Sequence, residues 1–287
     1  VRGGTIMPAR TTPASPLDAA YQGRPGAYSE SAARRLLGPD ASLLPCDTLE
    51  DAFAALAERR VARAVVPVEN TLAGTVSKTY DLLLEHDLTV IGEHVEHIDH
   101  VLIGPAGASV DRLVRVLSHP VALAQCERFF RAHPEIAAVP VFDTAGAVPL
   151  ALDDADGRTA AVASRAAAHL YGGSVLREHL QDHPENFTRF VLVSGDPTMP
   201  SAKSALKTII GLRLGNAPGA LWRALEPFAN AGINLTKIES RPVAGRPFEY
   251  AFVLELQSDG TAGVDAVLEE LSQRTRWMRV IGTFATS

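Results

Sequence analysis

The sequence predicts an α/β protein that carries a second, smaller ferredoxin-like domain at its C-terminal end. Between about residues 18 and 195, short apolar runs alternate with helical patterns, as in α/β folds. Residues 197–207 then combine prolines, serines and lysines, and we interpret them as a linker. After the linker the pattern becomes βαββαβ, which is the split βαβ arrangement.

Length and composition limit the class of protein further. The chain has 287 residues, enough for two or three compact units, and 46% of them are hydrophobic without a run that could span a bilayer. The net charge of −6 argues against a nucleic-acid surface, so an anionic ligand needs a local positive site. Cys46 and Cys126 fit a reducing cytosol. Residues 1–17 do not have the pattern of a signal peptide, and we expect a disordered tail on a cytoplasmic protein with no membrane partner.

Apolar spacing assigns the elements of the first domain in order. The predicted strands are residues 19–22, 64–68, 88–95, 100–103, 114–117, 139–142, 159–163 and 190–194. The predicted helices are residues 28–37, 49–56, 80–84, 123–130 and 164–170, with one more after Ala145. Asp47 and Glu50 have the spacing of a capping box for the second of these helices.

The second domain follows the same reasoning. Its strands are predicted at residues 210–214, 233–238, 250–256 and 278–284, and its helices at residues 221–228 and 264–271. A small sheet of this kind has exposed edges that commonly pair with a copy of themselves. We therefore expect a homo-oligomer.

Four strands of the first domain end in a small polar cluster that also opens a helix. The clusters are Gly26-Ala27-Tyr28-Ser29, Glu69-Asn70-Thr71, Ser118-His119-Pro120 and Asp143-Thr144-Ala145. Pro120 suits a first helical position, which leaves Ser118 or His119 as the cap. Helix N-termini attract anions, and ligands of open α/β sheets bind beyond the carboxyl ends of strands. A single cluster is explained as an N-cap, whereas four together predict one polar cleft.

The stretch Asn186-Phe187-Thr188-Arg189-Phe190 places a polar cluster at the start of an apolar strand. Its amide, hydroxyl and guanidinium suit a small anionic substrate, because arginine binds carboxylates through two parallel hydrogen bonds. Taken alone, the same residues are explained as an ordinary strand start. Together with the four clusters, they favour a binding site.

These residues resemble the prephenate dehydratase family with a C-terminal ACT regulatory domain. The shared motifs are Gly23-x-x-Gly26-Ala27-Tyr28-Ser29-Glu30, Val66-Pro67-Val68-Glu69-Asn70-Thr71-x-x-Gly74, Ser118-His119-Pro120-x-Ala122-Leu123-Ala124-Gln125-Cys126, Asn186-x-Thr188-Arg189-Phe190, Gly219-Ala220-Leu221 and Glu239-Ser240-Arg241-Pro242. Two positions depart from the family pattern. Val121 stands where the family usually has glutamine, and Asp143 where it has serine, so residue 121 is given no role and that of residue 143 stays open.

The resemblance implies a fold, a domain division and a function. It implies a two-lobed catalytic domain like a type 2 periplasmic binding protein at residues 18–196, a linker at 197–207 and an ACT domain at 208–287. It implies decarboxylating dehydration of prephenate to phenylpyruvate in phenylalanine synthesis, with no metal and no cofactor, feedback regulation by L-phenylalanine, and a dimer or tetramer. An arogenate dehydratase and a non-catalytic amino-acid sensor are the alternatives.

The resemblance also assigns residues to three sites. It places Thr188, Arg189, Asn70 and Ser118 in catalysis, with Thr188 as proton donor or as the hydrogen bond that orients the leaving hydroxyl. Arg189 either grips a carboxylate or supports Thr188. The substrate-binding residues are Gly26, Ser29, Glu69, Thr71, Gly74, His119, Thr144, Ala145, Asn186 and Phe190. The phenylalanine-binding residues are Asn216, Ala217, Gly219, Ala220, Leu221, Asn234, Leu235, Glu239 and Ser240.

Two other features are weighed and set aside. His94, His97 and His100 have a repeated spacing of three, but residues three apart on a strand face opposite sides, which is poor geometry for one metal. Cys126 lies on an apolar helix face and is expected to be a buried structural thiol.

Overall fold

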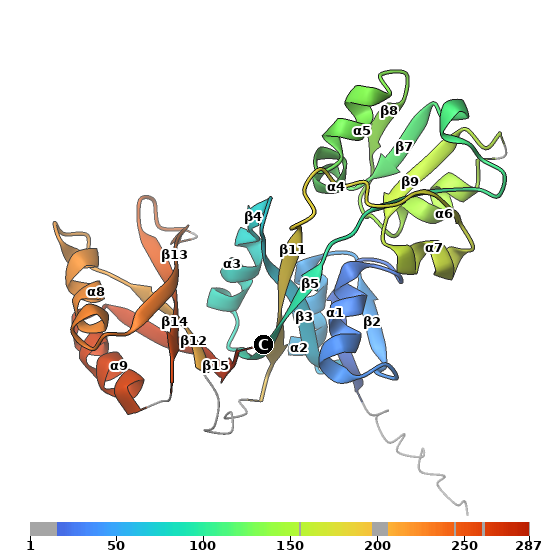
Figure 1. Cartoon of the computed structure of the whole chain (residues 1–287). Coiled ribbons are helices and arrows are strands. Elements are labelled where there is room, and N and C mark those ends of the chain that lie inside the picture. Colours follow the sequence, from blue (N-terminus) through green and yellow to red (C-terminus); the bar gives the residue numbers. More distant parts are fainter. Residues whose placement is uncertain (1–15, 155, 197–205, 244, 260–261, 287) are drawn as a thin grey trace, which may run out of the picture.

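The computed structural model describes residues 16–154, 156–196, 206–243, 245–259 and 262–286. They form two α/β lobes and a C-terminal domain built on an antiparallel sheet (Figure 1). Most of the tail and of the linker expected from the sequence lie outside the described residues. None of the helices in the described part of the chain is long and apolar enough to cross a membrane.

Lobe 1 is built around a mixed sheet with the strand order β2-β1-β3-β11-β5, and β4 pairs with β3. The strands are β1 (Leu17–Gln22), β2 (Leu43–Cys46), β3 (Val61–Asn70), β4 (Gly74–Thr75), β5 (Thr89–His97) and β11 (Phe187–Ser194). The helices are α1 (Tyr28–Leu37), α2 (Leu49–Ala57) and α3 (Ser77–Glu85).

Lobe 2 contains a sheet with the order β10-β6-β9-β7-β8. The strands are β6 (Val101–Gly104), β7 (Arg115–Ser118), β8 (Ala137–Pro140), β9 (Thr159–Ala163) and β10 (Ser174–Arg177). The helices are α4 (Pro120–Ala124), α5 (Glu127–Ala132), α6 (Ala147–Leu152) and α7 (Arg165–Tyr171), with a 3₁₀ turn η1 at Val110–Arg112.

The two sheets have equivalent strand orders. In lobe 1, β11 returns from lobe 2 and inserts antiparallel between β3 and β5. In lobe 2, β6 arrives from lobe 1 and inserts antiparallel between β9 and β10. Each lobe therefore holds one strand that follows a crossing from the other lobe. This arrangement confirms the predicted two-lobed fold of the type 2 periplasmic-binding-protein class.

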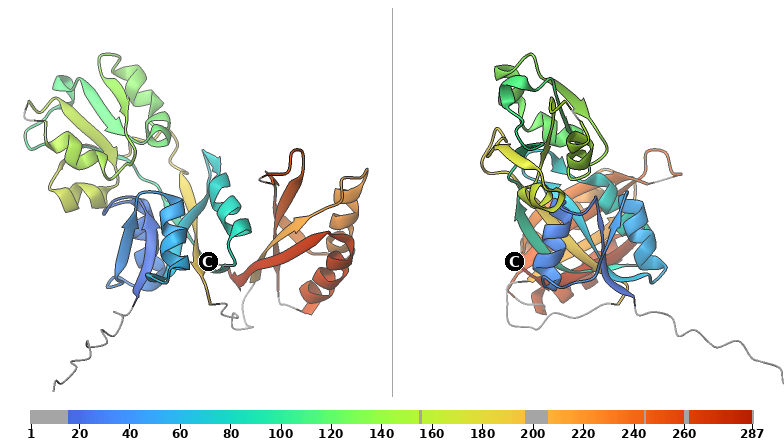
Figure 2. Two further views of the ribbon diagram at one scale, coloured as in Figure 1. Left: turned by 180° about the vertical axis from the view of Figure 1, so that it is seen from behind. Right: turned by 90° about the vertical axis from the view of Figure 1, so that its right-hand side faces the viewer.

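The C-terminal domain has the predicted βαββαβ order. Its elements are β12 (Leu206–Arg213), α8 (Ala220–Asn230), β13 (Asn234–Pro242), β14 (Tyr250–Ser258), α9 (Ala262–Arg274) and β15 (Trp277–Ala285). The sheet order is β13-β14-β12-β15, and α8 and α9 cover its outer face (Figure 1). The other face of the sheet lies against lobe 1, and lobe 2 lies away from it (Figure 2).

The C-terminal sheet and lobe 1 share one hydrophobic core. Ile209, Val253 and Ile281 from the C-terminal domain are buried in the same cluster as Val90 and Val191 of lobe 1. The backbones also approach closely, because a Cβ added at Gly282 would lie 2.1 Å from the carbonyl oxygen of Val90. A side chain there would force the two sheets apart, so the C-terminal domain is packed as an integral layer of the molecule.

Several local details differ from the sequence-based predictions. The strand expected at residues 139–142 is β8, at residues 137–140. The capping box of α2 uses Thr48 and Asp51, because the Thr48 side chain accepts from the Asp51 amide and the Asp51 carboxylate accepts from Thr48. The predicted Asp47–Glu50 box is therefore wrong by one residue. The single helix expected over residues 123–130 is divided into α4 and α5. Strands β2, β4 and β10 were not predicted, since they are short and lack a long apolar run.

Candidate functional site

A cleft of about 490 Å³ lies between the two lobes. Lobe 1 contributes the start of α1, the end of β3, the start of β11 and the β4 hairpin, while lobe 2 contributes α4 and the loop before α6. The described lining residues are Gln22, Gly23, Ala27, Tyr28, Ser29, Asp47, Leu49, Pro67, Asn70, Ala73, Gly74, Thr75, Val76, Ile98, His100, His119, Val121, Ala122, Gln125, Phe142, Asp143, Thr144, Thr188 and Phe190. The cleft is thus lined mainly by amides, hydroxyls and apolar groups.

Thr188 and Asn70 form the polar centre of the cleft. They lie opposite each other on the paired strands β11 and β3. The Asn70 Nδ2 group donates to Thr188 Oγ1 at 2.9 Å. Because the threonine oxygen accepts this bond, its own hydrogen is available to donate to another group.

The orientation of the Asn70 amide is fixed by its other bonds. Its Oδ1 accepts from the backbone amides of Leu72 at 3.0 Å and Ala73 at 2.8 Å. Backbone amides can only donate, so Oδ1 must face them and Nδ2 must face Thr188. The same Nδ2 group donates to Oδ1 of the fully buried Asn186 at 2.8 Å.

A β-bulge brings Asn70 and Pro67 to the same cleft wall. Thr188 pairs with Asn70 and Arg189 with Glu69, but Phe190 pairs with Pro67, so β3 contains one extra residue at this point. Without the bulge, residues three apart on a strand would face opposite sides. The bulge therefore turns the end of β3 so that Asn70 meets Thr188.

Gln125 connects this centre to lobe 2. Its Oε1 accepts from Asn186 Nδ2 at 3.0 Å and lies 2.9 Å from His100 Nε2, while its Nε2 donates to Asn70 Oδ1 at 3.3 Å. His100 is buried, and burial lowers its pKa against the opposing effect of the Gln125 hydrogen bond. The ring is therefore neutral at pH 7, and in the tautomer protonated at Nε2 it donates to the Gln125 oxygen.

Tyr28 extends the network to α1. Its hydroxyl donates to the Asp99 carbonyl at 2.7 Å and lies 3.1 Å from His100 Nδ1. Burial raises the pKa of Tyr28 well above its ordinary value, so the phenol stays protonated. Neutral groups from both lobes and from both crossing segments thus converge on Asn70 and Thr188.

The lobe 2 wall is built from helix starts. Pro120 occupies the first position of α4, and His119 caps the helix by accepting from the Val121 amide at 3.2 Å. Of the two predicted caps, His119 is therefore the one used. Asp143, which stands where the family usually has serine, accepts from the Gly146 amide at 2.6 Å just before α6. Its carboxylate therefore has a structural role.

The described lining of the cleft contains no lysine or arginine. The cation at its edge is Arg24, which forms an ion pair with the lining residue Asp47 at 2.9 Å. The Arg24 backbone amide also donates to Asp143 of lobe 2 at 3.4 Å. Arg24 therefore lies between two carboxylates at the junction of the lobes.

Seven of the predicted catalytic and substrate-binding residues line the cleft, namely Ser29, Asn70, Gly74, His119, Thr144, Thr188 and Phe190. Ser118 does not. It is fully buried, and its hydroxyl donates to the Val162 carbonyl of the neighbouring strand at 2.6 Å. The prediction of a catalytic Ser118 is corrected on this point, because its hydroxyl is used inside the lobe 2 sheet.

Arg189 also lies outside the cleft lining. It follows Thr188 on a strand, so the two side chains face opposite sides of the sheet. Arg189 Nη1 and Nη2 each donate to a carboxylate oxygen of Glu255 in the C-terminal domain at 2.8 Å. The alternative in which Arg189 grips a substrate carboxylate is therefore wrong for this geometry. The alternative in which it supports Thr188 is kept.

Five further predicted substrate-binding residues lie around the cleft but do not line it. Glu69 faces the C-terminal domain and pairs with Lys237 at 3.2 Å. Thr71 donates to the Glu185 carbonyl at 3.0 Å and so fixes the crossing segment before β11. Asn186 is buried behind Asn70 as described above.

The other two, Ala145 and Gly26, support the lobes. Ala145 is buried in the core of lobe 2. Gly26 has φ +90° and lies against α7 of the other lobe, where an added Cβ would come within 2.7 Å of Ala167 Cα. Its carbonyl accepts from Ser164 at 2.6 Å. Both are structural positions.

Sequence reasoning missed Tyr28, His100 and Gln125 as site residues. Tyr28 and Gln125 belong to motifs that this chain shares with the prephenate dehydratase family. Their place in those motifs is the signal that could have identified them as site residues. His100 was considered only as a metal ligand. In the structure, His94 pairs with Glu96 at 2.8 Å and His97 with the Pro184 carbonyl at 2.9 Å, so the three histidines are engaged separately. Among the described residues no cluster has the composition of a metal site. Cys126 is fully buried, as predicted, but it lies between α4 and α5 as the N-cap of α5 and not on a helix face. Burial raises the pKa of its thiol to about 12.

The predicted phenylalanine-binding residues lie on two parts of the C-terminal domain. Gly219 has φ +75° and caps α8, next to Asn216, Ala217, Ala220 and Leu221. The others, Asn234, Leu235, Glu239 and Ser240, lie on β13, an edge strand of its sheet. Glu239 accepts from Thr75 of lobe 1 at 3.2 Å.

Comparison with known proteins places this geometry among relatives. A family model for prephenate dehydratase matches residues 19–198, and one for the ACT domain matches residues 208–274. An arogenate dehydratase/prephenate dehydratase of Arabidopsis thaliana is 38% identical over 275 residues, covering 92% of this chain and 72% of that protein.

Two solved structures are similar over nearly the whole chain. A structure described as GqqA, a novel type of quorum quenching acylases, has 35% identity and a TM-score of 0.85, covering 93% of this chain and 97% of the other. A prephenate dehydratase of Arthrobacter aurescens in complex with L-Phe has 31% identity and a TM-score of 0.84, covering 93% and 89%.

Proposed function

We propose, from the premise that this chain belongs to the prephenate dehydratase family and carries an ACT domain, that it converts prephenate to phenylpyruvate in L-phenylalanine biosynthesis. The observation that carries the proposal is the bond from Asn70 to Thr188, which directs a polarised hydroxyl into the cleft between the lobes. The relatives support the reaction class, since the Arabidopsis protein is an arogenate/prephenate dehydratase.

The reaction needs one proton and two bond cleavages. The C–C bond to the ring carboxylate breaks and releases CO₂, and its electron pair enters the ring. The C–O bond to the para hydroxyl breaks, and the hydroxyl leaves as water after it receives a proton. The ring becomes aromatic, so the reaction runs downhill and the enzyme has to orient the dianion and assist the leaving hydroxyl.

Thr188 is assigned to the leaving hydroxyl. Its oxygen accepts from Asn70, so its hydrogen points to another acceptor, which in the complex is the substrate hydroxyl. A threonine is a weak acid, and the Asn70 hydrogen bond makes it a better donor by stabilising negative charge on the oxygen. General-acid assistance of this kind contributes roughly 10²–10⁴ in rate.

The two carboxylates of the substrate need positive partners. The start of α1 supplies one, because Ala27 at its N-cap provides no side-chain cap and Ala27, Tyr28 and Ser29 line the cleft. Arg24 supplies the other, because its guanidinium has further donors that can bind a substrate carboxylate while Nη2 stays paired with Asp47. We place the two carboxylates, which are attached directly or through the side chain to one ring carbon, at these two anion sites and the para hydroxyl at Thr188.

Regulation by L-phenylalanine is part of the proposal. It is supported by the ACT domain match and by the similarity to a prephenate dehydratase that was solved with L-Phe. The exposed loop around Gly219 and the edge strand β13 would form the effector site in a pair of chains. The proposed assembly is therefore a homo-oligomer, a dimer or a tetramer.

Arogenate is the second candidate substrate. It carries an ammonium group in place of the keto group of prephenate, and the carboxylates of Asp47 and Asp143 line the cleft where that group could bind. Both carboxylates already have partners, Asp47 in Arg24 and Asp143 in the Gly146 amide. This pairing favours prephenate, which has no cation to offer them.

The test compares the two substrates with purified protein. Phenylpyruvate formed from prephenate is followed by its enolate absorbance in alkali, phenylalanine formed from arogenate is measured in parallel, and the prephenate assay is repeated with added L-phenylalanine. We expect a higher kcat/KM for prephenate and suppression by L-phenylalanine. A higher kcat/KM for arogenate would mean that arogenate is the substrate, and the assignment of the catalytic site would stand. No turnover of either compound, with L-phenylalanine still raising the melting temperature, would favour the amino-acid sensor.

A further inference from the structure

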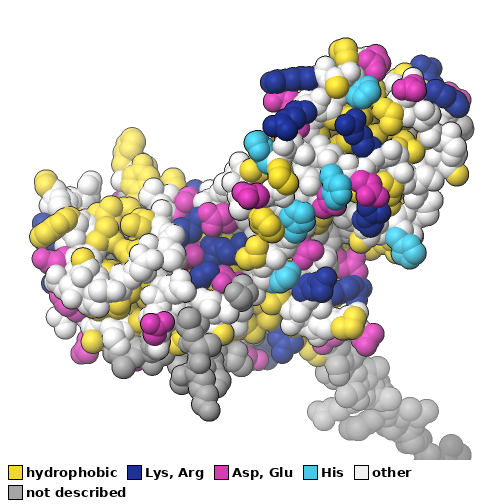
Figure 3. Space-filling view, viewed as in Figure 1, with side chains coloured by type: hydrophobic (Ala, Val, Ile, Leu, Met, Phe, Trp, Pro, Cys, Tyr) yellow, Lys and Arg dark blue, Asp and Glu magenta, His cyan; other side chains and the backbone are white. Residues whose placement is uncertain are grey.

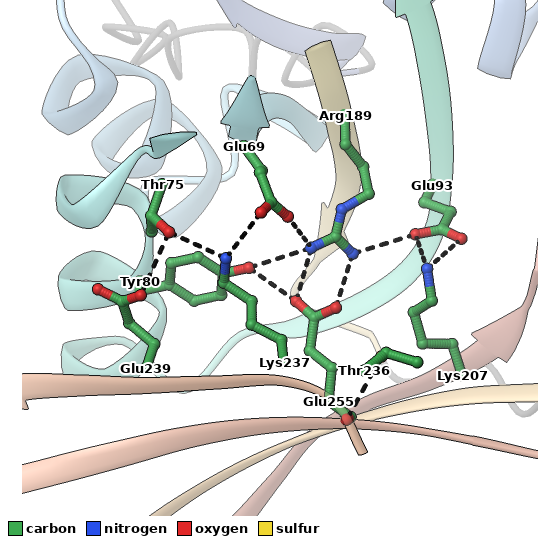
Figure 4. Close-up of polar contacts among 10 residues, drawn as sticks. All are labelled: Glu69, Thr75, Tyr80, Glu93, Arg189, Lys207, Thr236, Lys237, Glu239 and Glu255. Atoms are coloured by element: carbon green, nitrogen blue, oxygen red, sulfur yellow. Dashed lines mark hydrogen bonds and ion pairs between the residues drawn. The ribbon is translucent and has the colours of Figure 1, made fainter. Parts of the chain in front are cut away.

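A group of buried and half-buried polar side chains, most of them charged, joins lobe 1 to the C-terminal domain around Arg189 (Figure 4). Arg189 is the residue that follows Thr188 in the chain. We call this group the interdomain charge cluster. Lobe 1 contributes Glu69, Thr75, Tyr80, Glu93 and Arg189. The C-terminal domain contributes Lys207, Lys237, Glu239 and Glu255. The outer part of this border is visible as intermixed acidic and basic side chains in Figure 3.

Arg189 is the centre of the cluster. Its guanidinium forms two parallel hydrogen bonds with Glu255, both 2.8 Å long, and it also lies 3.2 Å from Glu69 and 3.3 Å from Glu93. Tyr80 donates to Glu255 at 2.7 Å and completes the enclosure. The side chains of Arg189 and Glu255 are 13% and 3% exposed. A planar, doubly bonded pair of this kind fixes direction as well as distance.

The remaining pairs cross the same border. Lys207 donates to both oxygens of Glu93 at 2.7 and 2.8 Å. Lys237 donates to Thr75 at 2.9 Å and pairs with Glu69 at 3.2 Å. In each pair one partner comes from lobe 1 and the other from the C-terminal domain. The cluster is therefore complete only when the two domains are docked.

Burial makes these partners dependent on one another. Burial opposes the ionised form of Glu255, but the hydrogen bonds and charge of Arg189 outweigh it and hold the pKa of Glu255 below its ordinary value. A buried carboxylate without such a partner would be strongly unfavourable, and so would a buried guanidinium. Neither Arg189 nor Glu255 is thus free to leave the other.

The cluster reaches the cleft through two adjacent contacts. Arg189 is bonded in the chain to Thr188, so a change in the direction of Arg189 turns the strand that presents the Thr188 hydroxyl. Thr75 lines the cleft and is held by both Lys237 and Glu239 of the C-terminal domain. The two strands that flank Asn70, β11 and β4, are therefore both held in place by contacts with the C-terminal domain.

We propose that Arg189 is a positioning residue whose partner is Glu255, so that the C-terminal domain holds Thr188 in its reactive orientation. The proposal rests on the proposed dehydratase function, but it concerns a different contact. It makes the C-terminal domain part of the catalytic unit even when no effector is bound.

The main test is Glu255→Gln, which keeps the size of the side chain and removes its charge. We expect kcat to fall on the order of 10- to 100-fold, because small misplacements of a reacting group have effects of this size. KM should change less than about threefold, since Arg189 does not touch the substrate. Tyr80→Phe keeps every charge and removes one hydroxyl, which donates to Glu255 at 2.7 Å and accepts from Arg189 at 3.3 Å. It should fold normally and lower kcat by a smaller factor, about threefold.

Arg279→Gln is the matched control. Arg279 also joins the C-terminal domain to lobe 1, where Nη1 donates to the His86 carbonyl at 2.7 Å and Nη2 donates to the Leu83 carbonyl. It contacts the end of α3 and no residue of the cluster. The control should lower the melting temperature without lowering kcat. Equal kcat losses in the two variants would mean that general loosening of the border, and not the Glu255 contact, is responsible.

A double-mutant cycle separates the two roles of Arg189. If Arg189 acts through Glu255, Arg189→Gln and Glu255→Gln affect kcat by less together than the product of their separate effects. If Arg189 instead binds substrate, Arg189→Gln raises KM strongly and its effect multiplies with that of Glu255→Gln. The second result would overturn the proposal.

Hydrogen exchange gives a readout that does not need turnover. Glu255→Gln should speed exchange of the amides at the start of β11 and the end of β3 by about tenfold or more, whereas Arg279→Gln should affect the end of α3. Unchanged exchange in β11 together with unchanged kcat would contradict the positioning role. A wild-type protein that turns over neither substrate would contradict the proposed function alone, and the exchange result would still decide this inference.

Discussion

The two faces of β11 show opposite solutions to holding a polar group in place. On the cleft face, Thr188 is held by neutral amides, with Asn70 and Asn186 bonded at 2.8 Å and Asn70 and Thr188 at 2.9 Å. On the other face, Arg189 is held by ions, and the side chain of its main partner Glu255 is 3% exposed. Adjacent residues of one motif therefore belong to two different environments.

The difference follows from what each face has to do. The neutral network adds no charge of its own to the cleft, so it does not compete with the charges of the substrate. It also leaves the hydroxyl hydrogen of Thr188 available to donate. An ionic network between domains tolerates no missing partner and therefore fixes the docking geometry. Changes on the cleft face should alter chemistry with little effect on stability, and changes on the other face should alter both.

The largest effect is expected from Thr188→Ala on the cleft face. The variant loses the proposed proton donor, so kcat should fall about 10²- to 10⁴-fold. It loses one half-buried hydrogen bond, so the free energy of unfolding should fall by only about 1 kcal/mol. Thr188→Ser keeps the hydroxyl and should stay within about tenfold of wild-type kcat. The measurements are steady-state kinetics and urea unfolding, and near-wild-type turnover by the alanine variant would remove Thr188 from the mechanism.

A smaller effect is expected from Arg24→Gln at the edge of the cleft. Loss of one charge-assisted hydrogen bond to a substrate carboxylate should raise KM about tenfold, with kcat changed less than about threefold. Arg60→Gln is the matched control, because Arg60 pairs with Glu58 at 2.9 Å on the surface of lobe 1. Equal KM values in the two variants would show that Arg24 does not hold the substrate.

The smallest effect concerns pH and His100. Burial lowers the pKa of His100 from its ordinary value of 6.5, so below that value the unfolded chain binds a proton that the folded chain resists. The stabilising contribution of the neutral ring is therefore complete above about pH 6.5 and is lost as the pH falls below it. Between pH 7.5 and 5.5 the free energy of unfolding should therefore fall on this account, by at most about 1.4 kcal/mol for each pH unit below 6.5.

His100→Gln tests the assignment of that pH dependence. Urea unfolding at the two pH values should give a smaller difference for this variant than for the wild type. The pKa of His119 is also lowered by burial, so His119→Gln serves as the comparison and should remove a different part of the slope. An unchanged slope in the His100 variant would mean that other groups carry the whole effect.

The sequence predicted most of the fold because its signals are local. The helix at residues 28–37 and the strand at residues 159–163 have the predicted bounds. The polar clusters at strand ends do meet in one cleft, as the position of strand ends in α/β sheets requires. Elements with little local signal, such as β10, had to be found in the structure.

The sequence predicted many of the residues of the candidate site, but it did not predict which way their side chains point. Alternation along a strand says that Thr188 and Arg189 face opposite sides, but it does not say which domain packs on the second side. Ser118 has the residue type of a ligand, and only the nearby Val162 carbonyl shows where its hydroxyl is used. Such contacts join residues far apart in the sequence, so no local pattern contains them.

The insertion of β11 between β3 and β5 has a consequence for biosynthesis of the protein. A ribosome releases the chain from its N-terminal end, so β3 and β5 emerge long before the strand that separates them in the finished sheet. Lobe 2, at residues 98–185, is continuous and can fold while translation proceeds. The sheet of lobe 1 cannot be completed until β11, which ends at residue 194, has left the ribosomal exit tunnel, so β3 and β5 lack the strand that pairs with both of them until then. The folding of lobe 1 should therefore be slower than that of lobe 2 and more dependent on chaperones.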